Sequence, residues 1–312
     1  MTLAIIALAV VLCFILAVSI YSSLEITKIP FLAVPYTPED FGLAYEDVSF
    51  PSHDGLKLNG WFLPATRPVP LMTDDSSHEL SSVINGTSSS VTLLILHGLG
   101  SNAGDMMMNT LCLARQGRWN LFYLNFRGHG GSEGRLTSLG PLELRDLECA
   151  MAHLKQTKPD ETRRLGIYGH SLGAAVAIVG AARHSDLEAV IAESPFSRVS
   201  FTVERFARIF YGIPAFPFMT LALFLAGLRA GVSIRSFAPA EEIGKIAPRP
   251  LLLIHAQRDL RMPLGEIRAL LAAAGEPKEL WIVPGSDHGE PWMVAKAEFE
   301  RRLVGFFQKA FM

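Results

Sequence analysis

Short, mostly apolar runs alternate with longer amphipathic stretches along most of the chain. The runs occupy residues 91–96, 119–126, 165–168, 187–192, 250–255 and 280–283. The helical spacing of apolar residues predicts helices at 103–116, 141–156 and 292–311. Runs without a polar face are typical of strands that are covered on both sides. The alternation of strands with helices therefore predicts the α/β class, with a mostly parallel central sheet and helices on both faces.

Two segments that precede these runs alternate between apolar and polar residues. They are residues 44–50 and 56–63, and a turn sequence at 53–55 separates them. This pattern predicts an antiparallel hairpin at one edge of the sheet. Residues 66–90, by contrast, are rich in Ser, Asp and Pro and show no periodicity, which predicts a long exposed loop.

The first part of the chain has no charged residue from Thr2 to Leu24. As a helix these residues would be about 35 Å long, enough to cross a hydrocarbon core of about 30 Å. A cleaved signal peptide is the alternative, with the small residues 17–19 as its cleavage site. A signal peptide requires basic residues at its start, and none precedes Glu25. We therefore expect an uncleaved, single-pass N-terminal transmembrane helix. Lys28 is the only basic residue near this segment, so the positive-inside rule does not orient it.

These features divide the chain into a transmembrane anchor at 1–25, a connector at 26–43 and one α/β domain at 44–312. Residues 198–234 interrupt the alternation inside the domain. Within them, residues 213–228 are almost entirely apolar and contain two prolines. One interpretation is an apolar helical cap over the active site that binds acyl chains or touches the bilayer. The other is a helical insertion packed into the core, and we favour the cap.

Composition excludes several functional classes. The net charge of −2 gives no support for nucleic-acid binding. The three cysteines, Cys13, Cys112 and Cys149, form no CxxC pair, so neither a disulfide framework nor a zinc site is expected. A single bridge between Cys112 and Cys149 stays open beside the interpretation as buried thiols. No metalloprotease, P-loop or dinucleotide-binding motif occurs, so we expect no metal and no cofactor.

A G-x-S-x-G sequence occupies residues 169–173, between an apolar run and a run of small residues. In that setting it predicts a nucleophile elbow, a sharp turn from strand to helix that holds Ser171 as the nucleophile. Side chains at 169 or 173 would collide with the neighbouring strand or helix, which explains the two glycines.

A serine hydroxyl needs a base within hydrogen-bond reach, and that base needs an orienting acid. We predict His288 as the base, because it lies on a glycine-bearing loop just after the last strand. Asp259 is the predicted acid, on the loop after the strand at 250–255. Glu193, at the end of an earlier strand, is the main rival. Asp287 is less suitable, because an immediate neighbour rarely orients the same ring.

The tetrahedral intermediate of such a reaction needs two donors for its oxyanion. The backbone N–H of Leu172 is one predicted donor, because it directly follows the nucleophile at a helix N-terminus. The second is expected from the loop after residue 96, with Leu99 as first choice and Gly100 as second.

Several motifs together resemble one known family. They are Asp54-Gly55, His97-Gly98-Leu99-Gly100, Arg127-Gly128-His129-Gly130-Gly131-Ser132, the elbow at 169–173, Glu193-Ser194-Pro195-Phe196, Asp259 with Pro263, and Asp287-His288. The set is similar to serine hydrolases of the α/β-hydrolase superfamily, and more narrowly to their membrane-anchored group labelled serine aminopeptidase S33-type. The similarity covers residues 45 to 290. Residues 255–259 depart from it, because they lack the glycine that many relatives have after the histidine.

The resemblance implies an α/β-hydrolase fold with a helical cap, in which the order Ser171, Asp259, His288 is the usual one. It implies a serine hydrolase that works through an acyl-enzyme. Together with the anchor and the apolar segment 213–228, it predicts carboxylic ester substrates with acyl, lipid-like or thioester groups at a membrane. A peptidase acting on short peptides is the alternative, and a non-catalytic binding protein is a third possibility. No nucleic-acid partner is expected.

Overall fold

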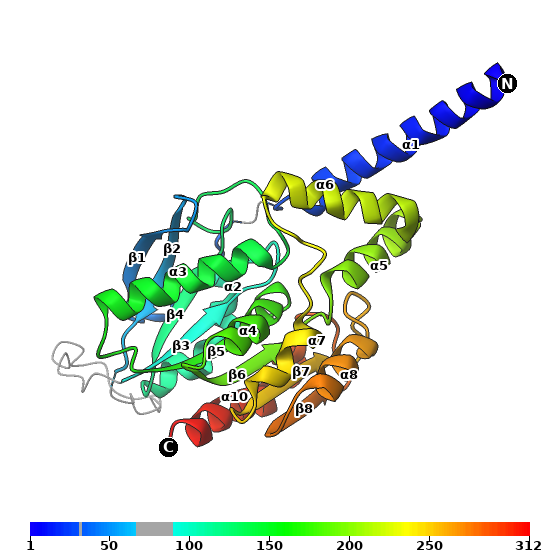
Figure 1. The fold of residues 1–312 in the computed structure, drawn as a ribbon. Helices are drawn as coiled ribbons and strands as arrows, with labels where there is room; N and C mark the ends of the chain where they lie inside the picture. Colours follow the sequence, from blue (N-terminus) through cyan, green and yellow to red (C-terminus); the bar gives the residue numbers. More distant parts are fainter. Residues whose placement is uncertain (31–32, 67–89) are drawn as a thin grey trace.

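The computed structural model describes residues 1–30, 33–66 and 90–312. Most of the loop predicted at 66–90 therefore lies outside the described residues. One eight-stranded sheet forms the centre of the molecule, in the order β1-β2-β4-β3-β5-β6-β7-β8 (Figure 1). Its strands are β1 (Glu46–Pro51), β2 (Lys57–Leu63), β3 (Val91–Leu96), β4 (Asn120–Asn125), β5 (Arg164–His170), β6 (Leu187–Glu193), β7 (Leu251–Ala256) and β8 (Lys278–Val283).

Strands β3 to β8 run parallel, whereas β1 and β2 form an antiparallel pair that joins the sheet through β2 and β4. The predicted hairpin at one edge is confirmed. Because parallel strands all point the same way, the loops after β3, β5, β6, β7 and β8 gather at the carboxyl ends of the strands. That end of the sheet carries every residue predicted for the site.

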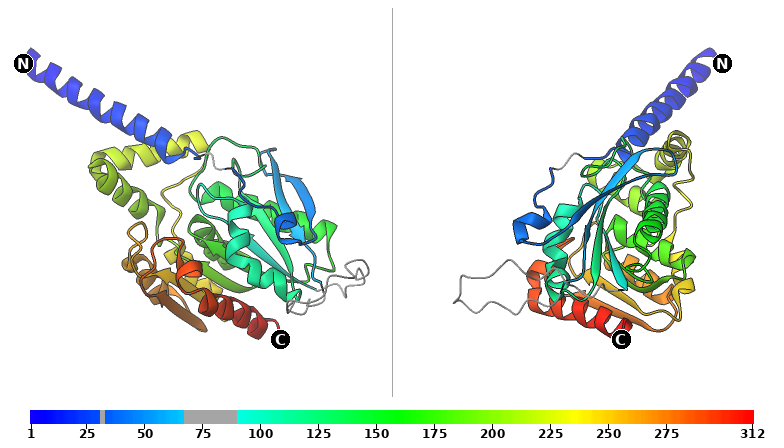
Figure 2. Two further views of the ribbon diagram at one scale, coloured as in Figure 1. Left: turned by 180° about the vertical axis from the view of Figure 1, so that it is seen from behind. Right: turned by 90° about the vertical axis from the view of Figure 1, so that its left-hand side faces the viewer.

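Helices cover both faces of the sheet. They are α2 (Ala103–Gln116), α3 (Pro141–Thr157), α4 (Leu172–Arg183), α7 (Pro239–Glu242), α8 (Leu264–Ala273), α9 (Pro291–Val294) and α10 (Lys296–Ala310). Alternate residues of β3 point to opposite sides: Leu94 and Leu96 join the core with α3 and α4, while Leu93 and Ile95 join the core with α2 and α10. Figures 1 and 2 show these two layers. The predicted mostly parallel sheet between helices is confirmed.

One predicted helix is wrong in its continuity. The chain at 292–311 forms two helices, α9 and α10, with Ala295 between them. Ala295 has a φ of −127° and a ψ of 45°, outside the helical range, so the axis breaks there. The three cysteines are free, which removes the bridge left open between Cys112 and Cys149.

The insertion between β6 and β7 forms a helical cap. It consists of α5 (Val199–Tyr211), the short turn η2 (Ala215–Met219) and α6 (Thr220–Ala230), followed by the turn η3 (Ile243–Ile246) after α7. One side of α6 is buried, with Ala222 and Leu223 in the core. The other side is exposed, with Phe224 and Leu228 open to the surroundings. The packing expected of a core insertion is therefore present on one side of α6, and the predicted contact of the cap with acyl chains or the bilayer stays a prediction.

Helix α1 (Thr2–Ile26) projects from the end of the molecule that carries the cap (Figures 1 and 2). It is long and apolar enough to cross a membrane. Its last turns pack on the cap: Ser19 Oγ donates to Phe218 O at 3.2 Å, and Arg229 Nη1 donates to Ser23 O at 3.1 Å. The turn η1 (Pro38–Phe41) follows in the connector.

Candidate active site

Ser171 lies on a sharp turn between β5 and α4. The strand ends at His170 and the helix begins at Leu172, so one residue joins them. Ser171 has a φ of 53° and a ψ of −112°. Such a conformation costs a non-glycine residue about 1–3 kcal/mol and persists where the surrounding structure enforces it. The Ser171 side chain stays partly exposed at the end of the sheet.

The two glycines of the elbow are explained by close backbone packing. A Cβ at Gly169 would lie 2.2 Å from Gly173 O, and a Cβ at Gly173 would lie 2.5 Å from Leu96 O. Because these partners are backbone atoms, no side-chain rotation could relieve the contacts. The glycines let α4 lie close to β5 and β3, which fixes the position of Ser171.

The structure brings Ser171, His288 and Asp259 together, although they are distant in the sequence. His288 Nε2 lies 3.1 Å from Ser171 Oγ, and His288 Nδ1 lies 2.6 Å from Asp259 Oδ2. With Nδ1 protonated, the imidazole donates to the carboxylate and its Nε2 is left to accept the hydroxyl proton. The His288 and Asp259 side chains are 8% and 0% exposed. This geometry is that of a nucleophile, a base and an acid that orients the base.

The Asp259 carboxylate is held from both sides. Met262 N–H donates to its other oxygen at 2.7 Å. Burial raises the pKa of Asp259, but the hydrogen bond and charge of His288, with the Met262 N–H, outweigh it and hold that pKa below its ordinary value. His255, a residue to which the sequence assigned no role, closes the same loop: its Nε2 lies 2.7 Å from Met262 O.

Glu193, the rival acid, makes a different contact. Its carboxylate accepts a hydrogen bond from Tyr168 O–H, and its Oε1 has no partner among the described residues. Burial raises the pKa of Glu193 to about 7, against the lowering effect of Tyr168. Of the two candidate acids, Asp259 therefore contacts His288, whereas Glu193 contacts Tyr168.

The loop after β3 lies against the elbow. A Cβ at Gly98 would lie 3.2 Å from Ser171 Cβ. The Gly100 N–H donates to His129 Nε2 at 3.2 Å, so this second-choice donor is already engaged. That contact favours Leu99 as the loop donor. Leu172 presents its N–H in the first turn of α4, where backbone donors lack helical partners. Both oxyanion assignments stay predictions.

Two histidines, His97 and His129, brace this loop. His97 Nε2 accepts from Phe126 N–H at 3.0 Å, and its Nδ1 lies 2.7 Å from Gly98 O. His129 uses the same pattern between Gly100 N–H and Arg127 O. Each ring needs one protonated and one unprotonated nitrogen for these contacts, so both are neutral. Burial lowers the pKa of His97 to about 3, in agreement with the geometry.

A buried network ties the cap to the loop that carries Asp259. Glu266, at the start of α8, accepts from Ser197 N–H at 2.8 Å and from Arg205 Nη1 at 2.6 Å. Arg205, on α5, also donates to Arg261 O at 2.8 Å. The sequence gave no signal for this network, because its members come from three separate segments.

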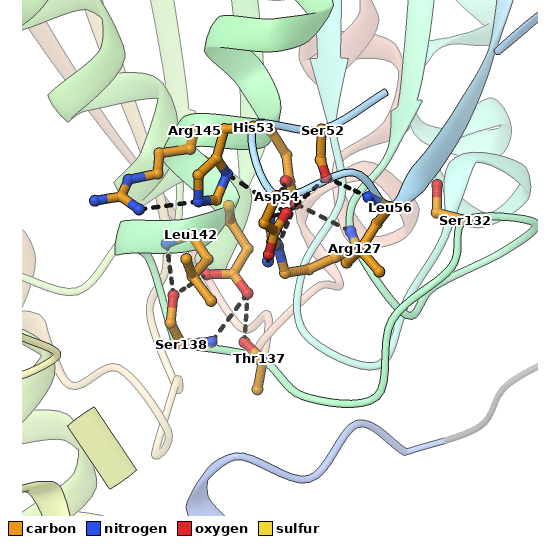
Figure 3. Close-up of polar contacts among 12 residues, drawn as sticks. Ser52, His53, Asp54, Leu56, Arg127, Ser132, Thr137, Ser138, Leu142 and Arg145 are labelled. Atoms are coloured by element: carbon orange, nitrogen blue, oxygen red, sulfur yellow. Dashed lines mark hydrogen bonds and ion pairs between the residues drawn. The ribbon is translucent and has the colours of Figure 1, made fainter. Parts of the chain in front are cut away.

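A second polar cluster surrounds Arg127 (Figure 3). Its guanidinium contacts Asp146 Oδ1 at 2.6 Å and Asp54 Oδ2 at 2.9 Å. Asp54 in turn accepts from Ser52 Oγ at 2.6 Å. Arg127 and Asp146 are 2% and 0% exposed. The cluster joins the turn of the first hairpin to the loop after β4 and to α3, and it explains two of the motifs that carried the family resemblance.

Known proteins share this fold and sequence pattern. The family model described as serine aminopeptidase, S33, matches residues 87–236. Uncharacterized protein YqkD of Bacillus subtilis (strain 168) is 32% identical over 217 residues, which cover 69% of this chain and 70% of that protein.

Two solved structures, one described as an esterase and the other as a peptidase, share the same architecture. The Pyrococcus furiosus esterase Pf2001 is 24% identical, with a TM-score of 0.70, over 91% of this chain and 99% of that chain. The Pyrococcus horikoshii acylaminoacyl peptidase is 17% identical, with a TM-score of 0.60, over 86% of this chain and 42% of that chain. At these identities the likeness shows the fold and leaves the substrate undecided. By its family match, its relative and its fold, the chain belongs to the α/β-hydrolase superfamily of hydrolases.

Proposed function

We propose that this chain is a membrane-anchored serine hydrolase that cleaves carboxylic esters with lipid-like acyl groups, thioesters included. The observation that carries the proposal is the hydrogen-bonded line from Ser171 Oγ through His288 to Asp259. The strained backbone of Ser171 supports it, because strain of this kind gathers at functional sites.

The geometry supports a two-step reaction. Ser171 Oγ attacks the carbonyl carbon while His288 Nε2 takes the hydroxyl proton, and Asp259 stabilises the resulting imidazolium. The Leu99 and Leu172 N–H groups bind the oxyanion of the tetrahedral intermediate, and each such donor contributes about 3 kcal/mol. The intermediate collapses as His288 gives its proton to the leaving alcohol, which departs and leaves an acyl-enzyme. A water molecule then repeats the sequence and releases the acid.

Two features support an ester with an apolar acyl group. Helix α1 is long enough to span a bilayer. The cap between β6 and β7 exposes aromatic side chains such as Phe216, which is 79% exposed. An anchored enzyme with an apolar cap suits substrates that partition into membranes.

A peptidase for short peptides is the second candidate. The family description and the acylaminoacyl peptidase structure favour it. An aminopeptidase would need a carboxylate for the substrate ammonium. Asp259 is bonded to His288 and Glu193 to Tyr168, and both are buried, so neither of these two serves. We therefore rank the esterase first.

Labelling with a fluorophosphonate probe tests the nucleophile. The full chain in detergent micelles should label, and Ser171→Ala should not. The matched control is Ser194→Ala, a second serine at positive φ whose side chain is buried; that variant should label like the wild type. Absence of wild-type labelling would leave the non-catalytic binding protein as the better interpretation.

Two substrate series separate the esterase from the peptidase. One is a set of p-nitrophenyl esters of increasing acyl length, and the other a set of aminoacyl p-nitroanilides. We expect kcat/KM to rise with acyl length and to exceed the anilide values throughout. Faster cleavage of the anilides would overturn the ester assignment while leaving the serine hydrolase mechanism intact.

A further inference from the structure

Exposed apolar side chains are unevenly distributed over the molecule. Beyond residue 36, the large apolar side chains that are exposed in the described part of the chain fall in two places, apart from Met312. One place is the cap. The other is a set of segments after the strands β3, β7 and β8, with Leu99, Leu260, Met293 and Val294. Apolar patches on one face of a soluble domain mark a surface that contacts something else.

The larger group forms what we call the cap face. Its members are Phe201, Ile209, Phe210, Phe216, Phe224 and Leu228. Residues 209–228 carry no charge, and Arg208 and Arg229 stand at the two ends of this run, both exposed. Arginines in that position can keep their guanidinium groups in water while their stems lie along an apolar surface.

The contact between the cap and α1 sets the depth of the cap. The Phe14 ring packs edge-on against the Phe218 ring, with 6.1 Å between centroids. Phe14 lies about 15 Å along the helix axis from Leu24, the last residue before the first charge. One leaflet contributes about 15 Å of hydrocarbon, and α1 exceeds a full core by only about 5 Å. If α1 crosses the membrane, Phe218 and the turn η2 around it lie inside the adjoining leaflet.

We infer that the cap face is inserted in the leaflet on the side of the hydrolase domain, and that the substrate ester reaches Ser171 from that leaflet. The inference rests on the proposed anchor and deepens the proposed function by naming the source of the substrate. A bilayer is favoured over a protein partner because α1 and the cap lie together at one end of the molecule (Figure 1) and pack on each other, and both expose apolar side chains there. A protein partner would have to share that surface with lipid.

The same placement accounts for the smaller apolar group. Leu99 adjoins the predicted oxyanion donor, Leu260 follows Asp259, and Met293 and Val294 follow His288 in α9. These residues therefore lie on the segments that carry the predicted oxyanion donor, the acid and the base. In the inferred placement they lie at the boundary between hydrocarbon and water, where the ester group of an amphipathic lipid also lies. Such a lipid would enter with its acyl chain still in contact with the cap.

Fluorescence depth measurements on the full chain test the insertion. Cys13, Cys112 and Cys149 are first replaced by Ala, and single cysteines are introduced by Phe216→Cys or Phe224→Cys for an NBD label. Ser185→Cys is the control, because Ser185 is exposed at the opposite edge of the sheet. Leu8→Cys reports on α1 itself. The proteins are reconstituted into phosphatidylcholine vesicles that contain lipids with a nitroxide on the acyl chain.

Labels at 8, 216 and 224 should be quenched by the nitroxide lipid and protected from iodide, whereas the label at 185 should show the reverse. Quenching at 8 with iodide access at both 216 and 224 would overturn the inference and leave the anchor standing. A lack of quenching at 8 would remove the anchor and the inference with it. None of these readouts needs hydrolysis, so a failure of the proposed ester chemistry is detected separately by fluorophosphonate labelling.

A kinetic test addresses the route of the substrate. The double variant Phe216→Ser, Phe224→Ser is compared with wild type on a long-chain ester in vesicles and on a water-soluble butyrate ester. We expect the ratio of the two rates to fall at least about tenfold, because the cap loses apolar contact with the leaflet. An unchanged ratio would overturn entry from the leaflet.

Discussion

Two polar clusters in this molecule both contain carboxylates bonded to a nitrogen-bearing side chain. In the first of them, that side chain also contacts a serine hydroxyl. Around Ser171, a carboxylate holds a histidine that reaches a hydroxyl on a strained, partly exposed turn. Around Arg127, the carboxylates of Asp54 and Asp146 both pair with one guanidinium, whose side chain is 2% exposed. Each cluster contains a buried pair of short polar contacts, His288 with Asp259 in the first and Arg127 with Asp146 in the second. The difference is that the hydrogen bonds of the first cluster lead to the Ser171 hydroxyl, whereas those of the second converge on the Arg127 guanidinium. Burial and charge alone therefore do not identify a reactive site.

The largest effect should follow removal of the end group of the first cluster. We predict that Ser171→Ala lowers kcat for the preferred ester by about 10⁶-fold, as loss of the nucleophile does in other serine hydrolases. Thermal unfolding should still be cooperative, because the hydroxyl makes few contacts. Steady-state kinetics and thermal melting of the same sample measure both. Residual activity above about 1% of wild type would place the nucleophile elsewhere.

Loss of the orienting acid should give the second-largest fall in kcat. Asp259→Asn keeps the shape of the side chain but favours the wrong tautomer of His288, so kcat should fall by about 10⁴-fold. The matched variant is Glu193→Gln at the end of the neighbouring strand, which should keep kcat within about threefold, because Glu193 bonds Tyr168 and not His288. If the two variants exchanged these outcomes, Glu193 would be the acid.

The second cluster should respond in stability rather than in rate. Arg127→Met leaves Asp146 buried without its partner, and breaking such a pair costs about 3–5 kcal/mol. We expect the free energy of unfolding in urea to fall by that amount, while kcat per folded molecule is retained. A large loss of kcat with unchanged stability would mean that this cluster takes part in the chemistry.

The sequence could predict those parts of the site that depend on local patterns. The G-x-S-x-G turn and the two candidate positions for the acid follow from local patterns, since each lies directly after an apolar run. The choice between Asp259 and Glu193 did not follow from pattern alone, because both residues end a predicted strand. It depends on which carboxylate meets the His288 ring in space.

Contacts between distant segments could not be predicted from the sequence. Arg205, Glu266 and Ser197 belong to α5, α8 and the loop before α5, and no periodicity connects them. The break at Ala295 was missed for a different reason. Residues 292–311 have an uninterrupted helical composition, and only the backbone angles of Ala295 reveal the break.

Glu193 should make stability depend on pH. Its pKa is about 7 in the folded protein and 4.5 in the unfolded chain, mainly because burial disfavours its charge. Its contribution to stability is therefore present below about pH 4.5 and is lost as pH rises through about 7. Wild type should lose up to about 3 kcal/mol over this interval, relative to Glu193→Gln. Urea unfolding of both proteins at pH 5 and pH 8 tests this, and an equal pH dependence would contradict it.

The smallest effect concerns the strain at the elbow. Glycine adopts a positive φ without the penalty that Ser171 bears, so Ser171→Gly should gain stability although it loses the nucleophile. We expect the gain to be about 1 kcal/mol over Ser171→Ala, which keeps a Cβ in the same conformation. Leu139→Gly is the matched control, because Leu139 also has a positive φ, of 55°, but belongs to the segment before α3 and not to the elbow.

Melting curves of these three variants, measured in the same detergent, distinguish two explanations of how the turn accommodates Ser171. If Ser171→Gly is more stable than Ser171→Ala, the backbone at the elbow holds strain that the reactive serine requires. If the two variants melt together, the packing of Gly169 and Gly173 alone accommodates the turn. The first cluster would then differ from the Arg127 cluster only in where its hydrogen bonds end, and not in the backbone that carries them.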